Sequence, residues 1–196
     1  MKRWWIAAAA LVVLVGAVAV WLSSRDDGVR PTAVASPFDP CPPPVSPAPT
    51  PSAAPGGEAL PRVVLPCFTE GEPVELAALG RPMVVNLWAS WCEPCRTELP
   101  QFQAFADKHP GEITVIGVVT EDTRAASASL AEDLQITFPA LYDSGGMLRR
   151  ALGGSALPVT LFVDAGGRVR HVARTGVLTV STLEALAREH LGLAPR

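Results

Sequence analysis

The amino-acid sequence predicts an α/β domain, with a mixed central β-sheet, helices on both of its faces and a short β-hairpin in front. Two nearly continuous apolar runs, residues 83–89 (MVVNLWA) and 113–119 (ITVIGVV), have the composition of central strands that are covered on both faces. A helical stretch follows each run, and the chain then continues with a further helical segment, a β-hairpin and a final helix. Because crossover helices and a hairpin occur together, a mixed sheet is favoured over a purely parallel one.

The first predicted element, residues 1–22, is a transmembrane helix that acts as a signal anchor. Residues 4–22 contain no charged or polar side chain, and a helix of this length spans about 28 Å, close to the thickness of a bilayer core. Two basic residues precede this run and two aspartates follow it, so the positive-inside bias places the rest of the chain outside the cytoplasm. A cleaved signal peptide is the alternative, because residues 33–35 (AVA) resemble a cleavage site, although they lie far beyond the apolar run.

Residues 23–59 are predicted to be a Pro/Ala-rich extracytoplasmic linker. Eleven of the 20 prolines fall between Pro31 and Pro61, and few large apolar residues are available to offset the entropy of ordering this segment. Proline at this density favours an extended, semi-stiff chain, so we expect a stalk that holds the folded domain away from the membrane. The net charge of −3 gives no indication of a nucleic-acid partner.

Residues 60–196 are the predicted folded domain. Turn residues separate the two strands of its first hairpin, at 62–65 and 74–76, and the last helix begins with residues 181–184 (STLE), which fit a capping box. The remaining expected elements are strands at 83–89, 113–119, 159–164 and 168–174 and helices at 92–108, 123–134, 144–152 and 181–191.

The motif Cys92-Glu93-Pro94-Cys95 follows the first apolar strand and opens the first helix. A cysteine at a helix N-terminus lies beside unpaired backbone N–H groups and the positive end of the helix dipole, and both favour the thiolate, which is the nucleophile in disulfide exchange. The second cysteine lies about one turn further on, where it can attack a mixed disulfide. A zinc site would need a second pair of ligands, and a purely structural bridge would close too small a loop to stabilise much. We therefore expect dithiol exchange, with no metal and no cofactor.

Two segments resemble a known family. Residues 85–100 (VNLWASWCEPCRTELP) resemble the active-site segment of the thioredoxin-like TlpA/ResA family, and residues 157–164 (LPVTLFVD) resemble its second signature. The resemblance covers residues 60–191 or so. It implies a thioredoxin fold and a membrane-anchored, extracytoplasmic thiol–disulfide oxidoreductase that acts on exported proteins. Reduction of apocytochrome c, in cytochrome c biogenesis, is one such role in this family.

The resemblance implies a role for each matching position. Cys92 corresponds to the exposed attacking cysteine, Cys95 to the buried resolving cysteine and Pro158 to the cis-proline that faces the disulfide. Asn86 stands where ordinary thioredoxins keep a buried aspartate, so that proton acceptor is missing. Leu157 is expected to offer main-chain hydrogen bonds to an extended substrate beside the disulfide.

Glu98 corresponds to the glutamate that this branch places near the active site. Because it lies three residues after Cys95, on the same helix face, a partly buried carboxylate there could accept the proton of the resolving thiol. An exposed helix glutamate is the alternative. Glu93 is expected to be a solvated surface charge, and Trp91 is expected to pack and to form a wall of the substrate groove.

Cys41 and Cys67 are predicted to form a structural disulfide. Both follow the predicted anchor, hence lie outside the cytoplasm, where disulfides persist, and neither has a reactive context. Closing a loop of about 26 residues would stabilise the fold by roughly 3 kcal/mol in the loop-entropy treatment. The bond would also attach the end of the stalk to the first hairpin.

The direction of exchange is predicted to be reduction. Strong oxidants stabilise their thiolate heavily, and a histidine between the cysteines helps to do so, whereas Glu93–Pro94 supplies a negative charge beside Cys92. A reductase outside the cytoplasm must be recharged, which implies a CcdA-like membrane electron donor. The alternatives are a disulfide-forming oxidase of the same fold, a peroxiredoxin-like peroxidase, for which Ala89 stands where threonine is usual, and a copper metallochaperone, which would need CxxxC and a distant histidine.

Overall fold

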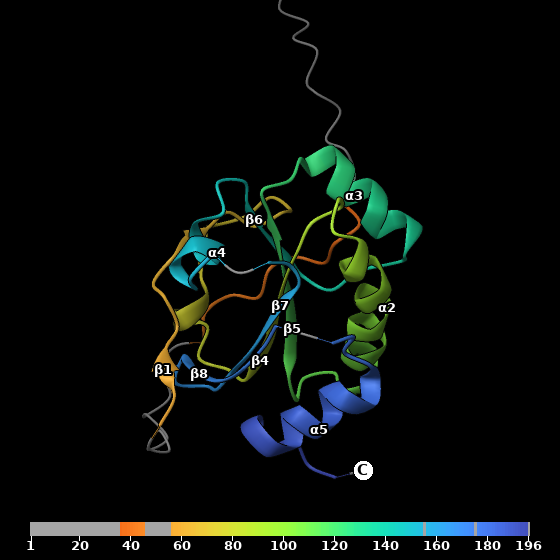
Figure 1. Ribbon diagram of the computed structural model, residues 1–196. Helices are drawn as coiled ribbons and strands as arrows, with labels where there is room; N and C mark the ends of the chain where they lie inside the picture. Colours follow the sequence, from red (N-terminus) through yellow and green to blue (C-terminus); the bar gives the residue numbers. More distant parts are fainter. Residues whose placement is uncertain (1–35, 46–55, 155, 175, 196) are drawn as a thin grey trace, which may run out of the picture. The chain divides into compact units, whose positions relative to one another are not determined.

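The computed structural model describes residues 36–45, 56–154, 156–174 and 176–195 (Figure 1). These residues form one compact unit that begins at Ser36. The predicted signal anchor, residues 1–22, and residues 23–35 of the predicted linker lie outside the described residues. Within the described ranges, no helix combines the length and the apolar character that a membrane crossing requires.

A six-stranded mixed sheet forms the centre of the unit, as the sequence predicts. Its central strand β4 pairs in parallel with β5 and antiparallel with β7, and every residue of β4 is buried. Strand β6 was not predicted, because a segment of four residues is too short for a periodic pattern. In spatial order the strands are β1 (Glu58–Ala59), β8 (Arg168–Ala173), β7 (Val159–Val163), β4 (Met83–Trp88), β5 (Thr114–Thr120) and β6 (Ala140–Asp143).

Alternate residues of the strands face two separate hydrophobic cores. Val84 and Trp88 of β4 pack in a core with α2 (Glu93–Lys108), α3 (Arg124–Asp133) and α5 (Val180–Leu191). Val85 and Leu87 pack in the other core, with the short helix α4 (Met147–Ala151), the 3-10 helix η1 (Leu76–Ala78) and the N-terminal hairpin. Figure 1 shows the three longer helices on one side of the sheet and α4 on the other.

The predicted N-terminal hairpin is present as two short strands. In it, β2 (Val64–Leu65) pairs antiparallel with β3 (Val74–Glu75). Just after β2, Cys67 forms a single antiparallel bridge with Leu141 of β6. The hairpin therefore covers the second core and also reaches one edge of the sheet.

Two parts of the predicted linker belong to the folded unit. Phe38 is only 4% exposed, and its ring meets Phe68 edge-on with 4.7 Å between centroids. Further along, strand β1 pairs antiparallel with β8. The unit therefore begins earlier than residue 60. Phe38 packs one end of the segment into the core, although one aromatic side chain among the prolines hardly changes the average composition.

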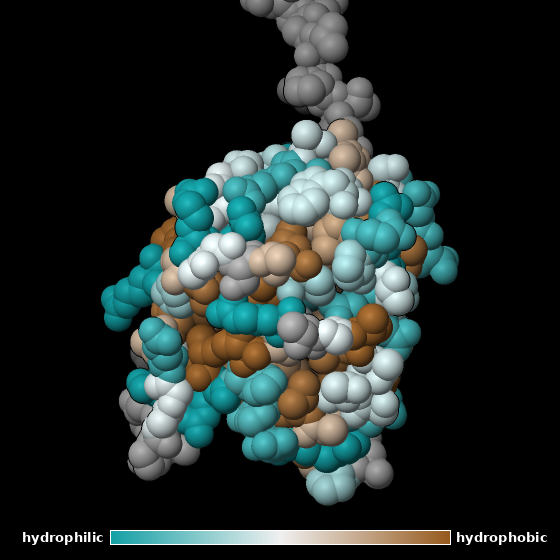
Figure 2. Space-filling view, viewed as in Figure 1, coloured by the Kyte–Doolittle hydropathy of each residue, from teal (hydrophilic) through white to brown (hydrophobic). Residues whose placement is uncertain are grey.

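The surface view from the side of Figure 1 shows hydrophilic residues over much of the unit, with hydrophobic residues gathered in a broken band across the middle (Figure 2). Few large apolar side chains are exposed among the described residues, and the most exposed of them is Trp91, at 60%. Scattered apolar residues are usual on soluble domains, but an exposed tryptophan beside a conspicuous cysteine motif points to a binding role.

Candidate active site

Cys92 and Cys95 form a disulfide at the N-terminus of α2, with 5.3 Å between their Cα atoms. Cys92 is the N-cap of the helix, and its Sγ accepts a hydrogen bond of 3.3 Å from the backbone N–H of Cys95. The expectation of an exposed Cys92 is wrong for this disulfide form, because Cys92 is only 5% exposed and Cys95 1%. Pro94 lies in the first turn, where its missing N–H costs nothing. The helix therefore directs its positive end and an N–H donor at Cys92, and both lower the free energy of a thiolate there.

The loop before Cys92 is fixed by the loop that follows β5. The carboxylate of Asp122 accepts hydrogen bonds from the backbone N–H of Ser90 (2.6 Å) and from its hydroxyl (3.0 Å). From the other side, the Arg96 guanidinium donates two hydrogen bonds, of 3.2 and 3.1 Å, to the Ser90 carbonyl. The Trp91 indole donates to the backbone carbonyl of Glu121 at 3.0 Å, so this exposed ring is held beside Cys92.

Pro158 lies at the same end of the sheet as the cysteines. The Leu157–Pro158 peptide bond is cis, as the family resemblance implies. Antiparallel pairing of Leu87 with Val159 places Pro158 level with Trp88, the last residue of β4, directly before the loop that carries Cys92. Leu157 is partly buried and packs against both hydrophobic cores.

Asn86 is buried within β4, two residues before the strand ends. Its side-chain amide donates to the hydroxyl of Thr160 at 3.2 Å, and its Oδ1 has no hydrogen-bond partner within the described ranges. A neutral amide therefore occupies the interior beneath the motif, where it can donate a hydrogen bond but cannot act as a carboxylate base.

Glu98 is buried, with 1% of its surface exposed, so the alternative of an exposed helix glutamate is wrong. One carboxylate oxygen accepts a hydrogen bond of 3.0 Å from the backbone N–H of Leu178, and the other has no partner among the residues that the structure describes. Burial raises the pKa of Glu98 above its ordinary value of 4.5, and the Leu178 N–H opposes part of that rise. Glu98 and Pro158 line the same small hollow, so the structure brings these two predicted site residues together.

Glu93 is solvated, as expected, with 91% of its side chain exposed. The Arg96 guanidinium lies 3.9 Å from the Glu93 carboxylate, so the negative charge beside Cys92 is partly offset. Exposed pairs of this kind contribute little to stability, which leaves the local electrostatic potential as their main effect.

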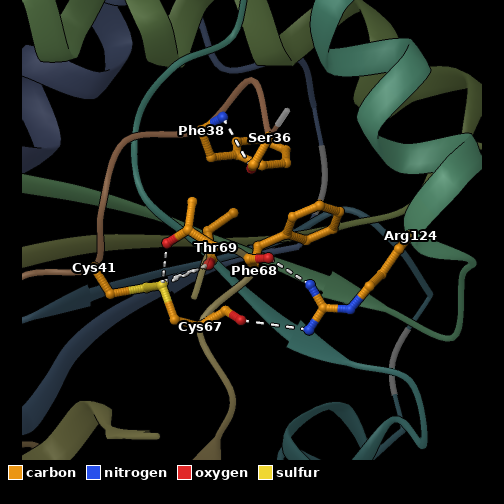
Figure 3. Close-up of a disulfide and its surroundings, with 8 residues drawn as sticks. Ser36, Phe38, Cys41, Cys67, Phe68, Thr69 and Arg124 are labelled. Carbon is orange, nitrogen blue, oxygen red and sulfur yellow. Dashed lines mark hydrogen bonds between the residues drawn. A yellow bond between two sulfur atoms is a disulfide. The ribbon is translucent and has the colours of Figure 1, made fainter. Parts of the chain in front are cut away.

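Cys41 and Cys67 are joined in a second disulfide, with 6.0 Å between their Cα atoms. Figure 3 shows this disulfide together with Thr69, Phe68 and Arg124. The bridge between Cys67 and Leu141 places it beside β6, where the hairpin is attached to the sheet. This disulfide belongs to a different part of the unit from the Cys92 motif. Across the described residues, no group of three or more histidine, cysteine or acidic side chains is arranged to hold a metal ion.

Comparison with known proteins agrees with this geometry. The Redoxin family matches residues 55–186, which is more than half of the chain. The chain belongs to the redoxins. Within them it falls in the TlpA/ResA-like group, because it is 31% identical over 130 residues to sporulation thiol-disulfide oxidoreductase A of Bacillus subtilis, an alignment that covers 64% of this chain and 78% of that protein.

Two further similarities place the redoxin among thiol–disulfide oxidoreductases. It is 27% identical over 113 residues to the thiol-disulfide oxidoreductase ResA of Oceanobacillus iheyensis, covering 57% of this chain and just over half, 58%, of that protein. The structure of a DsbF homologue from Corynebacterium diphtheriae matches with a TM-score of 0.60 and 25% identity, over 68% of this chain and 87% of that one. The redoxin therefore has the thioredoxin-like fold and is a thiol–disulfide oxidoreductase.

Sequence reasoning missed two residues of the redoxin that hold the active-site loop. Asp122 lies two residues after the end of the central strand β5, and polar residues at the carboxyl ends of such strands often form part of a site. Its position in the sequence could therefore have identified Asp122 as a candidate site residue. Arg96, by contrast, is an ordinary helix residue in the sequence, and only the fold brings its guanidinium to the Ser90 carbonyl.

Proposed function

We propose that this redoxin reduces disulfides in exported proteins through Cys92 and Cys95. In the reduced protein, the Cys92 thiolate attacks a substrate disulfide and forms a mixed disulfide, releasing one substrate thiolate. Cys95 then attacks the Cys92 sulfur, the substrate leaves with its second thiol, and the Cys92–Cys95 disulfide remains. The observation that carries the proposal is the position of Cys92 as the N-cap of α2, with the Cys95 N–H donating to its sulfur.

Glu98 is proposed to take up and return the proton of Cys95. It lies one helical turn after Cys95, on the same face, and its second carboxylate oxygen has no partner within the described part of the chain. Because burial raises the pKa of Glu98 above 4.5, its carboxylate is a stronger base than that of an exposed glutamate, which suits it to accept a proton. Asn86 cannot replace it, since an amide does not titrate.

Trp91 and the Leu157–Pro158 segment are proposed to receive the substrate on the two sides of Cys92. Trp91 offers an exposed apolar ring whose indole N–H is already satisfied by the Glu121 carbonyl. The backbone of Leu157 can offer hydrogen bonds to an extended chain. The Trp91 ring and the Leu157 backbone together suit unfolded substrates of varied sequence, because neither contact depends on a particular substrate side chain.

Reduction is proposed as the direction because no histidine lies between the cysteines. Glu93 adds a negative charge that disfavours the Cys92 thiolate, although Arg96 offsets part of it. The proposed arrangement has residues 1–22 as the anchor of a single-pass protein in the cell membrane, the domain outside the cytoplasm and a CcdA-like membrane protein as electron donor. Apocytochrome c is a proposed substrate.

Trapping in the cell tests the proposal. Cys95→Ala in the full chain leaves Cys92 able to form mixed disulfides but removes the resolving thiol, so we expect covalent adducts that a reductant releases. The matched control is the double variant Cys92→Ala/Cys95→Ala. Adducts with exported cysteine-containing proteins support the proposal, whereas an adduct pattern equal to that of the double variant contradicts it.

A further inference from the structure

The second disulfide lies on the wall of a cavity. A cavity of about 430 Å³ lies between the proline segment 40–44 and residues 70–79, and Cys41 and Cys67 both line it. Cys67 is nearly buried, whereas Cys41 is partly exposed. A thiol that enters this cavity therefore meets the Cys41 sulfur first, and the volume is within the range of small-molecule sites.

The groups around the two sulfurs favour cleavage that leaves the charge on Cys67. The hydroxyl oxygen of Thr69 lies 3.0 Å from the Cys67 sulfur and can donate its proton to a thiolate there (Figure 3). The carbonyl oxygen of Ala140 lies 3.4 Å from the Cys41 sulfur and 3.8 Å from the Cys67 sulfur, and it can only accept. The two sulfurs therefore share an acceptor, and the hydroxyl of Thr69 adds a donor at Cys67, as a leaving thiolate requires.

The charge that lines the cavity selects among thiols. Glu70, Glu72 and Glu75 belong to its lining. Two cations lie close by: the largely exposed Arg62, 4.0 Å from Glu75, and Arg81, whose guanidinium is 3.1 Å from the Pro43 carbonyl of the lining, so the three carboxylates leave the lining negative on balance. An anionic thiol is repelled by such a lining, and a cationic thiol is attracted. The apolar surfaces of the prolines suit a short aliphatic chain.

The disulfide also holds the segment 36–45 against the unit. Apart from the bond itself, Phe38 is packed against Phe68 and Trp88, and the backbone of the segment makes hydrogen bonds to Thr137 and Leu79. An additional hydrogen bond runs from the Arg81 guanidinium to the Pro43 carbonyl. These few contacts oppose the entropy of ordering the whole segment, so the covalent bond decides whether it stays in place.

We propose that this cavity is a second thiol-exchange site, for small cationic or uncharged thiols, and that exchange there releases residues 36–45. The inference does not depend on the reaction proposed for Cys92. Release would withdraw Phe38 from Trp88, which lies four residues before Cys92, and so links the redox state of the second disulfide to the packing beneath the active-site loop.

The step balances as an ordinary exchange. A thiolate RS⁻ attacks the Cys41 sulfur, the Cys41–Cys67 bond breaks, and its electron pair leaves on Cys67, beside the Thr69 hydroxyl. A second thiolate attacks the RS sulfur of the mixed disulfide and releases RSSR and the Cys41 thiolate. Two RSH are oxidised to RSSR, and the protein disulfide is reduced to two thiols once protons are taken up.

The test compares two thiols of opposite charge on the full chain carrying Cys92→Ala/Cys95→Ala, which removes the other disulfide. Oxidised protein is mixed with cysteamine or 3-mercaptopropionate at equal thiolate concentration, quenched with acid, alkylated and mapped by mass spectrometry. Dividing the two rates by those of the urea-unfolded protein removes the intrinsic reactivities. We expect cysteamine to react about tenfold faster after this correction, with the ratio falling in salt and in the variant Glu70→Gln/Glu72→Gln.

Hydrogen exchange on the same samples tests the release. We expect amide protection to be lost in residues 36–45 after reduction and to be kept in β4 and β5. Equal corrected rates for the two thiols, or rates independent of thiol concentration, would overturn the exchange site, because reduction would then follow global unfolding. Protection that is unchanged in 36–45, or lost throughout the unit, would overturn the release.

Discussion

Removing the Cys41–Cys67 disulfide tests how much the fold depends on its covalent connection to the N-terminal segment. The variant Cys41→Ser/Cys67→Ser keeps side chains of similar size, and a serine at 67 can still hydrogen-bond to the Thr69 hydroxyl. The bond closes a loop with a sequence separation of 26. Loop entropy in the unfolded chain then gives a loss of about 3.5 kcal/mol in the free energy of unfolding, which for a domain of this size lowers Tm by about 7–14 °C.

The other disulfide provides the matched control within the same protein. Cys92→Ser/Cys95→Ser makes the same chemical change, but the sequence separation is 3. The same entropy relation gives a loss of about 1.6 kcal/mol. Urea denaturation of both variants and the wild type, followed by tryptophan fluorescence, measures the three free energies, and the dependence on urea should steepen when the longer loop is opened, because more surface is then exposed in the unfolded chain.

The result that would refute this reasoning is a reversed or equal order of the two losses. A loss below about 1 kcal/mol for the Cys41–Cys67 variant would mean that residues 36–45 contribute little to the folded unit or that the unfolded state is already compact. Such a result would also remove the structural argument that the unit begins at Ser36.

Three further predictions concern single positions. Burial raises the pKa of Glu98 above 4.5, so ionisation of Glu98 lowers the free energy of unfolding as pH rises above that value. Glu98→Gln should remove this decrease, which urea denaturation at a series of pH values from 4 to 8 measures. A pH dependence of the variant equal to that of the wild type would contradict the prediction. Gly117→Ala would place a Cβ 2.9 Å from the Trp88 indole nitrogen, and the overpacking should cost about 1–3 kcal/mol in thermal unfolding, whereas an unchanged Tm would show that the ring moves freely. The hydrogen bond from Lys108 is the main cause that lowers the pKa of Glu184 to about 2. The stability that Glu184 contributes is therefore present above pH 4.5 and lost as pH falls toward 2. The free energy of unfolding of Glu184→Gln should fall less than that of the wild type over this range, and an equal fall would count against the prediction.

The central strands and the cysteine motif could be predicted from the sequence because their signals are local. The apolar runs that became β4 and β5 need burial on both faces whatever the rest of the chain does. The capping of α2 by Cys92 also follows from neighbouring residues. The capping box predicted at 181–184 was wrong, because Thr179 caps α5. The Glu184 carboxylate contacts Lys108 and His109 instead, and this contact between distant segments could not be predicted from the sequence alone.

Contacts between distant segments account for what the sequence did not reveal. Asp122 reaches Ser90 across 32 positions, and Phe38 reaches Phe68 across a stretch of prolines whose average composition predicts a linker. The burial of Glu98 also needs a distant partner, since Leu178 supplies the hydrogen bond that makes a buried carboxylate tolerable. In each case a single polar or aromatic side chain makes the contact, and no periodic pattern in the sequence predicts it.

The reduction potential of the Cys92–Cys95 pair tests the central claim most directly. The oxidised full chain, carrying Cys41→Ser/Cys67→Ser so that one disulfide is observed, is equilibrated with graded ratios of a thiol buffer, and the reduced fraction is read by alkylation and mass. A reductase should give a potential close to that of thioredoxin, about −270 mV. A value close to that of DsbA, about −120 mV, would contradict the proposed direction and assign the redoxin to disulfide formation.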